Sequence, residues 1–516
     1  MAYLYVGGDR DQQLLLPVSM ADWLEEGHLA WLVIDVVASI DTSAFHAKHR
    51  NDGVGRPAYH PDMMLALLLY AYGIGLRSSR RIEAACLTDA AFRVICGSAT
   101  PDHATICRLH CDHEAALEET FVQILRLCAT AGLVQVGTIA IDGTKMAADA
   151  ALDQNRSGDW LRAEVAKLLA EARATDADED VQEALFAPPE MPAALATRSG
   201  RLTRPRAALA AIEAEDAAAA EARARAQEAQ AAAAEGRRLA GRKPKDPHAA
   251  LARAEAEHAA AVVAAEHKAA RRAEREAAEA AAGRRLRGQP LGPDRGLEEA
   301  TTALEAARAA AAEAAPVARV ANTTDPESRI MKTAKGWVQG YNCQAVATAH
   351  QVVVSCEVSQ DANDVGLYQP MVDKTEAMLA AVGITGAIGT VTADAGYWSE
   401  ENATAEGPDR LIATQKDCKQ RRAAREMGAT TGPPATDAAP LEAMEHRRRT
   451  AEGAAIYATR SHTIEPVLGD HKENRGWHGS RRRGLSAVQS EWALMSASHN
   501  LSKLFDHRRR QQVALA

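Results

Sequence analysis

Three acidic residues, each at the end of a predicted element, are the residues of this chain best suited to catalysis. Asp142 and Asp394 each end a run rich in β-branched residues, which favours a strand. Glu465 precedes Pro466, a residue common in the first helical turn, so it is expected at the mouth of a helix. Carboxylates on separate elements are suitable ligands for Mg2+, which prefers oxygen. The pattern predicts a magnesium site for phosphate chemistry.

Two Mg2+ ions about 4 Å apart activate an attacking hydroxyl and stabilise the leaving oxygen of an in-line displacement. Asp142 would be shared between the ions, while Asp394 and Glu465 would each complete one of them. Lys472 follows Glu465 by seven residues on nearly the same helix face, where it could hold a phosphate. Simpler interpretations remain open. Asp142-Gly143 is also a favoured hairpin dipeptide, and Glu465 fits a solvent-facing acid favoured by the helix dipole.

Composition indicates a globular protein with an uneven charge distribution. The chain has 516 residues, 47% of them hydrophobic, enough for two to four domains. Its formal net charge of −9 argues against nucleic-acid binding only if the charge is evenly spread. The C-terminal portion instead carries three arginine triplets, Arg447–Arg449, Arg481–Arg483 and Arg508–Arg510. The average therefore hides a basic region.

The sequence shows no apolar run of about twenty residues and no signal-peptide pattern at its start, so we expect a cytoplasmic protein without a membrane span. Eight cysteines without a CxxC pair are typical of reduced thiols. Cys107 and Cys111 lie four residues apart and share a helix face, most simply the core face. Together with His110 and His113 they could instead hold a metal, the less favoured interpretation.

Residues 1–130 are predicted to be helical. Short amphipathic segments alternate with tight glycine turns, and Arg77, Arg80 and Arg81 lie at the start of one of them. This arrangement is typical of a helix-turn-helix-like DNA-binding module. An ordinary helical bundle with solvated arginines explains the same pattern.

Residues 156–320 change in composition. Long stretches consist almost wholly of Ala, Glu, Arg and Gln, a composition that favours helices without a leucine-type coiled coil. We predict a long helical insertion; a partly disordered connector is the alternative.

Residues 131–155 and 321–506 are predicted to form one α/β core with a mixed sheet. The expected order is strand, hairpin, helix, strand, strand and closing helix, which is the ribonuclease-H-like plan. Asp142 falls on its first strand, and Asp394 on the strand after its first helix, so the two acids are expected side by side at the sheet centre. Residues 507–516 form a basic tail. Trp398, four residues past Asp394, could be core or a platform for stacking an unpaired base.

An ordered set of short motifs occurs at both ends of the chain. The motifs are Arg56-Pro-Ala-Tyr-His-Pro, Arg77-Ser-Ser-Arg-Arg-Ile-Glu, Pro101-Asp-His-Ala-Thr-Ile, Asp142-Gly-Thr, Lys335-Gly-Trp-Val-Gln-Gly-Tyr-Asn, Ala393-Asp-Ala-Gly-Tyr, Glu491-Trp-Ala-Leu and His499-Asn-Leu-Ser-Lys. Each motif is modest, but their order is specific. In this order they resemble the DDE transposases of bacterial insertion sequences, in the group with an InsH-type N-terminal domain and a Tyr-Arg-Glu-Lys signature.

The resemblance implies that Asp142, Asp394 and Glu465 bind two Mg2+ ions, with Mn2+ as a substitute. It implies contacts with the transposon-end strand from three further residues, Tyr457, Arg460 and Lys472. The step from Arg460 to Glu465 is five, one wider than in the signature.

The activity implied is cutting and joining of DNA at terminal inverted repeats. Double-stranded DNA would be held by the N-terminal domain and by Arg481, Arg482 and Arg483, and the protein would act as a homodimer at the nucleoid. Two alternatives stay open, a metal-dependent nuclease of the same fold and a catalytically inactive DNA-binding protein derived from a transposase.

Overall fold

The chain divides into two compact units, Met1–Ala150 with Ser328–Ala516, and Ala151–Glu327. The structure is a computed structural model that describes residues 19–47, 58–183, 203–218, 247–281, 294–313, 319–415, 426 and 428–515. Arg56 of the first motif and most of the alanine-rich stretch 213–235 lie outside the described residues.

The N-terminal part of the first unit is helical, as predicted. Pro61 opens α3 in its first turn, where its missing N–H removes no helical hydrogen bond. The Asp102 carboxylate caps α6 by accepting from the Thr105 amide. The helices of this N-terminal part are η1 (Met20–Trp23), α1 (Leu29–Ser39), α2 (Ser43–His46), α3 (Pro61–Gly73), α4 (Ser79–Thr88), α5 (Ala90–Ile95), α6 (His103–Asp112) and α7 (Glu114–Thr130).

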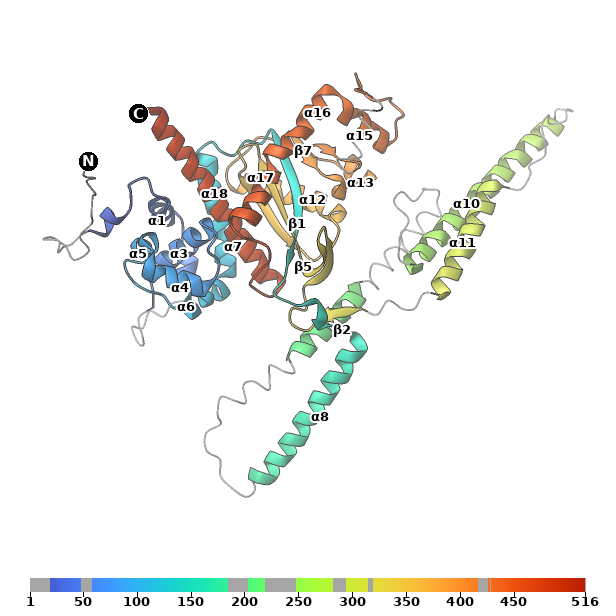
Figure 1. Ribbon diagram of the computed structural model, residues 1–516. Helices are drawn as coiled ribbons and strands as arrows, with labels where there is room; N and C mark the ends of the chain where they lie inside the picture. Colours follow the sequence, from blue (N-terminus) through green and yellow to red (C-terminus); the bar gives the residue numbers. More distant parts are fainter. Residues whose placement is uncertain are drawn as a thin grey trace, which may run out of the picture. The chain divides into compact units, whose positions relative to one another are not determined.

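A mixed sheet forms the centre of the same unit (Figure 1). The strands follow the order β4-β5-β1-β7-β8, and β6 also pairs with β5. β1 runs antiparallel to β5 and parallel to β7, and β7 is parallel to β8. The predicted mixed sheet is therefore confirmed, with β1 at its centre. The strands are β1 (Thr138–Ala147), β4 (Arg329–Thr333), β5 (Gly336–Thr348), β6 (Val353–Ser359), β7 (Thr390–Ala393) and β8 (Asp409–Ile412).

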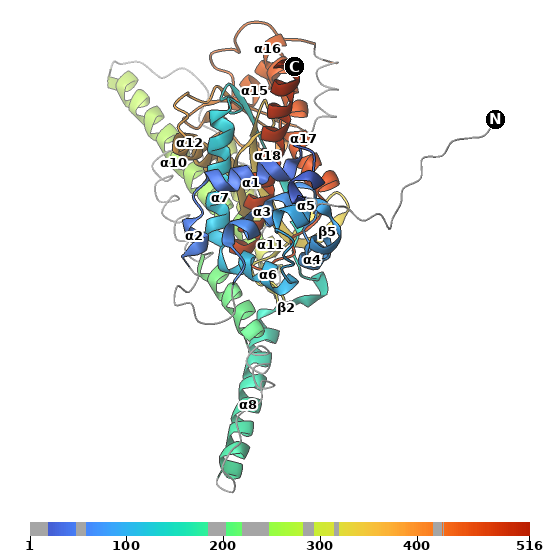
Figure 2. The same ribbon diagram turned by 90° about the vertical axis from the view of Figure 1, so that its left-hand side faces the viewer.

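Helices from the second half of the chain pack against this sheet. α12 and α18 both contact β6, and α17 contacts β1 and β5. α18 also lies alongside α7, so the helices of the N-terminal part and the sheet share one hydrophobic core (Figure 2). These elements are η4 (Val365–Leu367), α12 (Tyr368–Ala381), η5 (Ala395–Tyr397), α13 (Glu400–Thr404), α15 (Pro440–Arg449), α16 (Ala451–Ala458), η6 (Thr459–His462), α17 (Ile464–Gly469), the π-helix η7 (Asp470–Asn474) and α18 (Leu485–Leu515).

The second unit is mostly helical. It contains η2 (Leu152–Gln154), β2 (Asn155–Ser157), α8 (Gly158–Glu183), α10 (Pro247–Ala281), α11 (Arg295–Glu313) and β3 (Val320–Asn322), with β2 antiparallel to β3. α10 and α11 pack as an antiparallel pair, held by ion pairs Lys268–Asp294 at 3.0 Å and Arg308–Glu255 at 3.7 Å. Helix formation by the Ala/Glu/Arg-rich sequence is confirmed for these described segments.

Candidate active site

Asp142 and Asp394 lie near each other because their strands are neighbours that run in the same direction. The parallel pairing of β1 and β7 ends at Ala140 and Thr392. Beyond that pair the strands separate: β7 ends one residue later, whereas β1 continues through Asp142. Asp394 directly follows β7, so both carboxylates lie where the two strands part.

The environment of Asp142 disfavours its negative charge. The side chain is 21% exposed. Burial raises its pKa to about 6, the nearby Arg460 opposes this rise, and the charges of Asp394 and Asp364 add to it. A divalent cation placed among these carboxylates would favour the ionised form of Asp142.

Arg460 is a buried counter-charge in this structure. Its Nη1 donates to the carbonyl oxygens of Ile141 and Thr392, at 2.7 and 3.1 Å, and its Nη2 lies 3.1 Å from Asp142 Oδ2. The guanidinium thus fills the space where β1 and β7 part, and its side chain is 5% exposed. The resemblance implied contact with DNA; the structure instead places Arg460 inside the protein.

Asp364 is an acid of this site that the sequence analysis missed. It follows β6 and precedes η4, and its side chain makes no cap bond to that helix. Its Oδ1 instead accepts from Asn342 Nδ2 at 2.7 Å and from Gln344 Nε2 at 3.0 Å, both on β5. The available signal was an acid in the loop after a strand, since β6 ends at Ser359 and Asp364 lies five residues later.

Glu465 lies in the first turn of α17, as predicted, and is exposed. α17 packs on β1 and β5, which brings this helix to the strand that carries Asp142. Among the described residues, the His, Cys, Asp and Glu groups whose ligand atoms all lie within 4.8 Å of one another are His46–His60–Asp62 and Asp470–His471–His499. The carboxylate oxygens of Asp142, Asp394 and Glu465 therefore do not all lie within 4.8 Å of one another.

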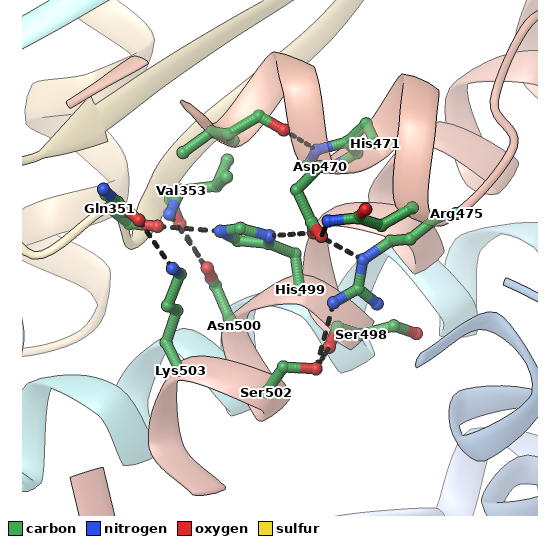
Figure 3. Close-up of polar contacts among 12 residues, drawn as sticks. Gln351, Val353, Asp470, His471, Arg475, Ser498, His499, Asn500, Ser502 and Lys503 are labelled. Atoms are coloured by element: carbon green, nitrogen blue, oxygen red, sulfur yellow. Dashed lines mark hydrogen bonds and ion pairs between the residues drawn. The ribbon is translucent and has the colours of Figure 1, made fainter. Parts of the chain in front are cut away.

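The segment that carries Glu465 and Lys472 is fixed by a buried polar network (Figure 3). Asp470 Oδ2 accepts from Arg475 Nε at 2.6 Å and from His499 Nδ1 at 2.8 Å. The other ring nitrogen of His499 lies 2.9 Å from the Gln351 carbonyl oxygen. This network joins η7 to α18 and to the β5–β6 turn. Because Arg475 and His499 already bond Asp470, the network holds the segment in place.

Two family models match the chain. Residues 18–110 match the one described as Transposase domain (DUF772), and residues 413–505 match the one described as Transposase DDE domain. The chain is a relative of the insertion-sequence DDE transposases. The second match includes Glu465 and Lys472, and the first includes the helices from α1 to most of α6. No curated protein and no solved structure shows significant similarity to the chain.

The arginines predicted to bind DNA fall into two groups in this transposase relative. Arg77 and Arg482 face inward. Arg77 donates to the carbonyl oxygens of Gly476 and Gly479 and lies 4.8 Å from the centre of the Trp477 ring. Arg482 pairs with Glu114 at 2.5 Å and donates to the His110 carbonyl at 3.1 Å.

The arginines of the second group are exposed. Arg80, Arg81 and Arg481 lie on the surface, and Arg483, also exposed, pairs with Asp149 at 2.8 Å. Only this group is placed so that it can contact DNA phosphates without rearrangement of the core.

The other candidate DNA-contacting residues are half-buried. Trp398 packs against the hydrophobic core, and Lys472 is half-buried in η7. The Tyr457 ring lies 3.7 Å from the guanidinium carbon of Arg448 and 5.9 Å from that of Arg460. Tyr457 therefore joins Arg460 to the arginine triplet at the end of α15.

Cys107 and Cys111 do not face the core, which corrects the sequence analysis. Both are exposed on α6. The core face of this helix carries Ile106, Leu109 and His110 instead.

Within the described helices, none is long and apolar enough to cross a membrane.

Proposed function

We propose that this chain cuts DNA at insertion-sequence ends and joins those ends to target DNA, by two-metal phosphoryl transfer at Asp142, Asp394 and Glu465. The observation that carries the proposal is the position of Asp142 and Asp394 at the point where parallel strands β1 and β7 part, in a chain whose two ends match transposase families. The order β4-β5-β1-β7-β8, in which β5 is antiparallel to β1, β4 and β6, supports a ribonuclease-H-like core.

The donor set fits Mg2+. The carboxylates of Asp142 and Asp394 are hard oxygen ligands, and the crowding of negative charge that raises the pKa of Asp142 is relieved by a cation. Bound Mg2+ supplies charge stabilisation for the attacking and leaving oxygens of an in-line displacement. Asp142 and Asp394 would bind the ions from the sheet, and Glu465 would approach from the mouth of α17.

Two successive reactions account for cutting and joining. In the first, water attacks the phosphodiester at the transposon end, the P–O3′ bond breaks, and a 3′-hydroxyl and a 5′-phosphate result. In the second, that 3′-hydroxyl attacks a target phosphodiester and displaces the target's own 3′-oxygen. Lys472, seven residues after Glu465, would hold a phosphate of the end strand. Exposed Arg80, Arg81 and Arg481 would bind the DNA backbone, and two copies of the chain would hold a pair of ends.

The test uses duplex DNA that carries the inverted repeats flanking the coding region. Asp142→Asn, Asp394→Asn and Glu465→Gln are each expected to abolish strand cleavage while end binding stays nearly unchanged, because each removes a negative ligand and keeps its volume. Cleavage without joining would indicate a nuclease, and end binding without cleavage by the unmodified protein would indicate an inactive transposase relative. Cleavage by the Asp142→Asn protein would exclude this residue from the site.

A further inference from the structure

We propose that Asp364 is a fourth carboxylate of the metal site and binds a divalent cation together with Asp394. This inference rests on the proposed function, because it assigns a further ligand to the same site.

The Asp364 carboxylate is held in one orientation with one oxygen left for a ligand. The side-chain amides of Asn342 and Gln344 both donate to the same oxygen, Oδ1. Asn342 is itself fixed, since it also donates to the Asp361 carbonyl at 3.1 Å and accepts from Gln344 at 3.0 Å. The Gln344 oxygen in turn accepts from the Tyr397 hydroxyl. A chain of neutral donors thus orients Asp364 without neutralising it.

The free oxygen of Asp364 faces the same small space as Asp394. A Cβ placed on Gly396 would lie 2.9 Å from Asp394 Oδ1 and 3.0 Å from Asp364 Oδ2. The glycine therefore leaves room for two carboxylate oxygens that converge from different loops. Asp394 is fixed here too, because its Oδ1 accepts from the Gly396 amide at 2.8 Å.

A second glycine lets Asp364 approach the strand that carries Asp142. A Cβ on Gly143 would lie 3.0 Å from Asp364 Oδ1 and would overlap the Gln344 amide. Gly143 immediately follows Asp142, so the absence of a side chain there brings the charges of Asp364 and Asp142 within reach of each other. After burial, the charge of Asp364 is among the effects that raise the pKa of both Asp142 and Tyr397.

Hydrogen bonding alone does not explain an aspartate at position 364. An asparagine would keep the oxygen that accepts from both amides and would remove a charge that is repelled by Asp142 and Asp394. In the absence of a cation the aspartate is therefore the less favourable residue. With a cation between Asp364 and Asp394 it is the more favourable one, because a carboxylate is a stronger ligand for a hard cation than an amide.

The experiment compares Asp364→Asn with Asp361→Asn in the full chain. Asp361 is exposed and lies three residues earlier in the same loop, so it is a matched control. Mn2+ binding is measured by titration with electron paramagnetic resonance of the free ion, and thermal unfolding is measured in chelator. Asp364→Asn is expected to weaken Mn2+ binding by at least about tenfold, while its metal-free Tm equals or exceeds that of the unmodified protein. Asp361→Asn should change neither.

A second variant removes no carboxylate. Gly396→Ala places a methyl group against Asp394 Oδ1 and Asp364 Oδ2, and should also weaken Mn2+ binding. Unchanged Mn2+ affinity of Asp364→Asn would overturn the inference, as would a lower metal-free Tm, which would show a structural role. If Asp142→Asn loses Mn2+ binding and Asp364→Asn does not, only the assignment of Asp364 fails. If the unmodified protein binds no Mn2+, both the proposed function and the assignment of Asp364 fail.

Discussion

Arg460 Nη2 lies 3.1 Å from Asp142 Oδ2, and the same guanidinium donates to carbonyl oxygens of both β1 and β7. One buried arginine therefore fixes the separation of the two strands and partly neutralises the central acid. Its position in the sequence, five residues before Glu465, also ties the helix that carries Glu465 to the strand that carries Asp142. Arg460 is thus a positioning residue for the proposed metal site.

Arg460→Met should destabilise the fold. The change leaves Asp142 as an unpaired, largely buried carboxylate and two strand carbonyls without their donor, a loss of about 3 kcal/mol or more in the free energy of unfolding. Urea unfolding measures it. Arg481→Met is the control, because Arg481 is exposed, and it should change this free energy by no more than about 0.5 kcal/mol. Equal effects of the two variants would show that Arg460 does not hold the strands.

Ionisation of Asp142 should lower the free energy of unfolding of the metal-free protein as pH rises. Because the pKa of Asp142 is raised to about 6 from 3.8, the folded state favours the protonated form. The stability that this group contributes is fully present below pH 3.8 and is lost as pH rises through 6. The asparagine of Asp142→Asn does not titrate. The free energy of unfolding of this variant, relative to that of the unmodified protein, should therefore increase as pH rises across this interval, by about 3 kcal/mol at most.

The comparison is made by urea unfolding in chelator at a series of pH values. Saturating Mn2+ should shift the transition of the unmodified protein to lower pH, because the cation favours the ionised carboxylate. A pH-independent difference between the two proteins would show that Asp142 has an ordinary pKa.

Exposed and internal arginines should respond differently to substitution. Arg81→Ala is expected to weaken duplex binding and to reduce the slope of log affinity against log salt by about 0.9, the contribution of one phosphate contact. Arg482→Ala should instead destabilise the protein by about 2 kcal/mol or more, since it removes the ion-pair partner of the partly buried Glu114. Fluorescence anisotropy over a salt series and urea unfolding separate the two effects. A flat salt response of the unmodified protein would contradict phosphate binding altogether.

Trp398→Ala should separate packing from a role in DNA distortion. The side chain is half-buried against the core, so its removal is expected to cost about 2–3 kcal/mol without unfolding the protein. If the indole also stacks on an unpaired base, the variant will bind duplex ends normally but cleave them poorly, and an end with a pre-unpaired base will partly restore the rate. Trp337→Ala, at a residue that is 62% exposed, is the control. Aggregation of Trp398→Ala would assign the indole to the core alone.

Local patterns in the sequence placed Asp142 on a strand and Asp394 directly after one, but the prediction that Asp142 ends its strand was wrong, because β1 continues to Ala147. β-branched runs form strands through short-range preferences, and the order of elements makes their strands neighbours. The helical N-terminal part, Pro61 in the first turn of α3 and the position of Glu465 at the start of α17 follow from local preferences in the same way. The predicted domain boundaries at residues 130 and 320 and the predicted metal ligands stay predictions.

The tertiary structure decided which polar residues face inward. The side-chain amides of Asn342 and Gln344, on β5, hold Asp364 in the site. Arg482 pairs with Glu114, which is 368 residues away in the sequence. Arg460 donates to carbonyl oxygens of β1 and β7. Cys107 and Cys111 share the helix face that the sequence predicted, but packing left that face outside. Periodicity identifies residues that share a face, whereas long-range contacts determine which face is buried and which charge has a partner there.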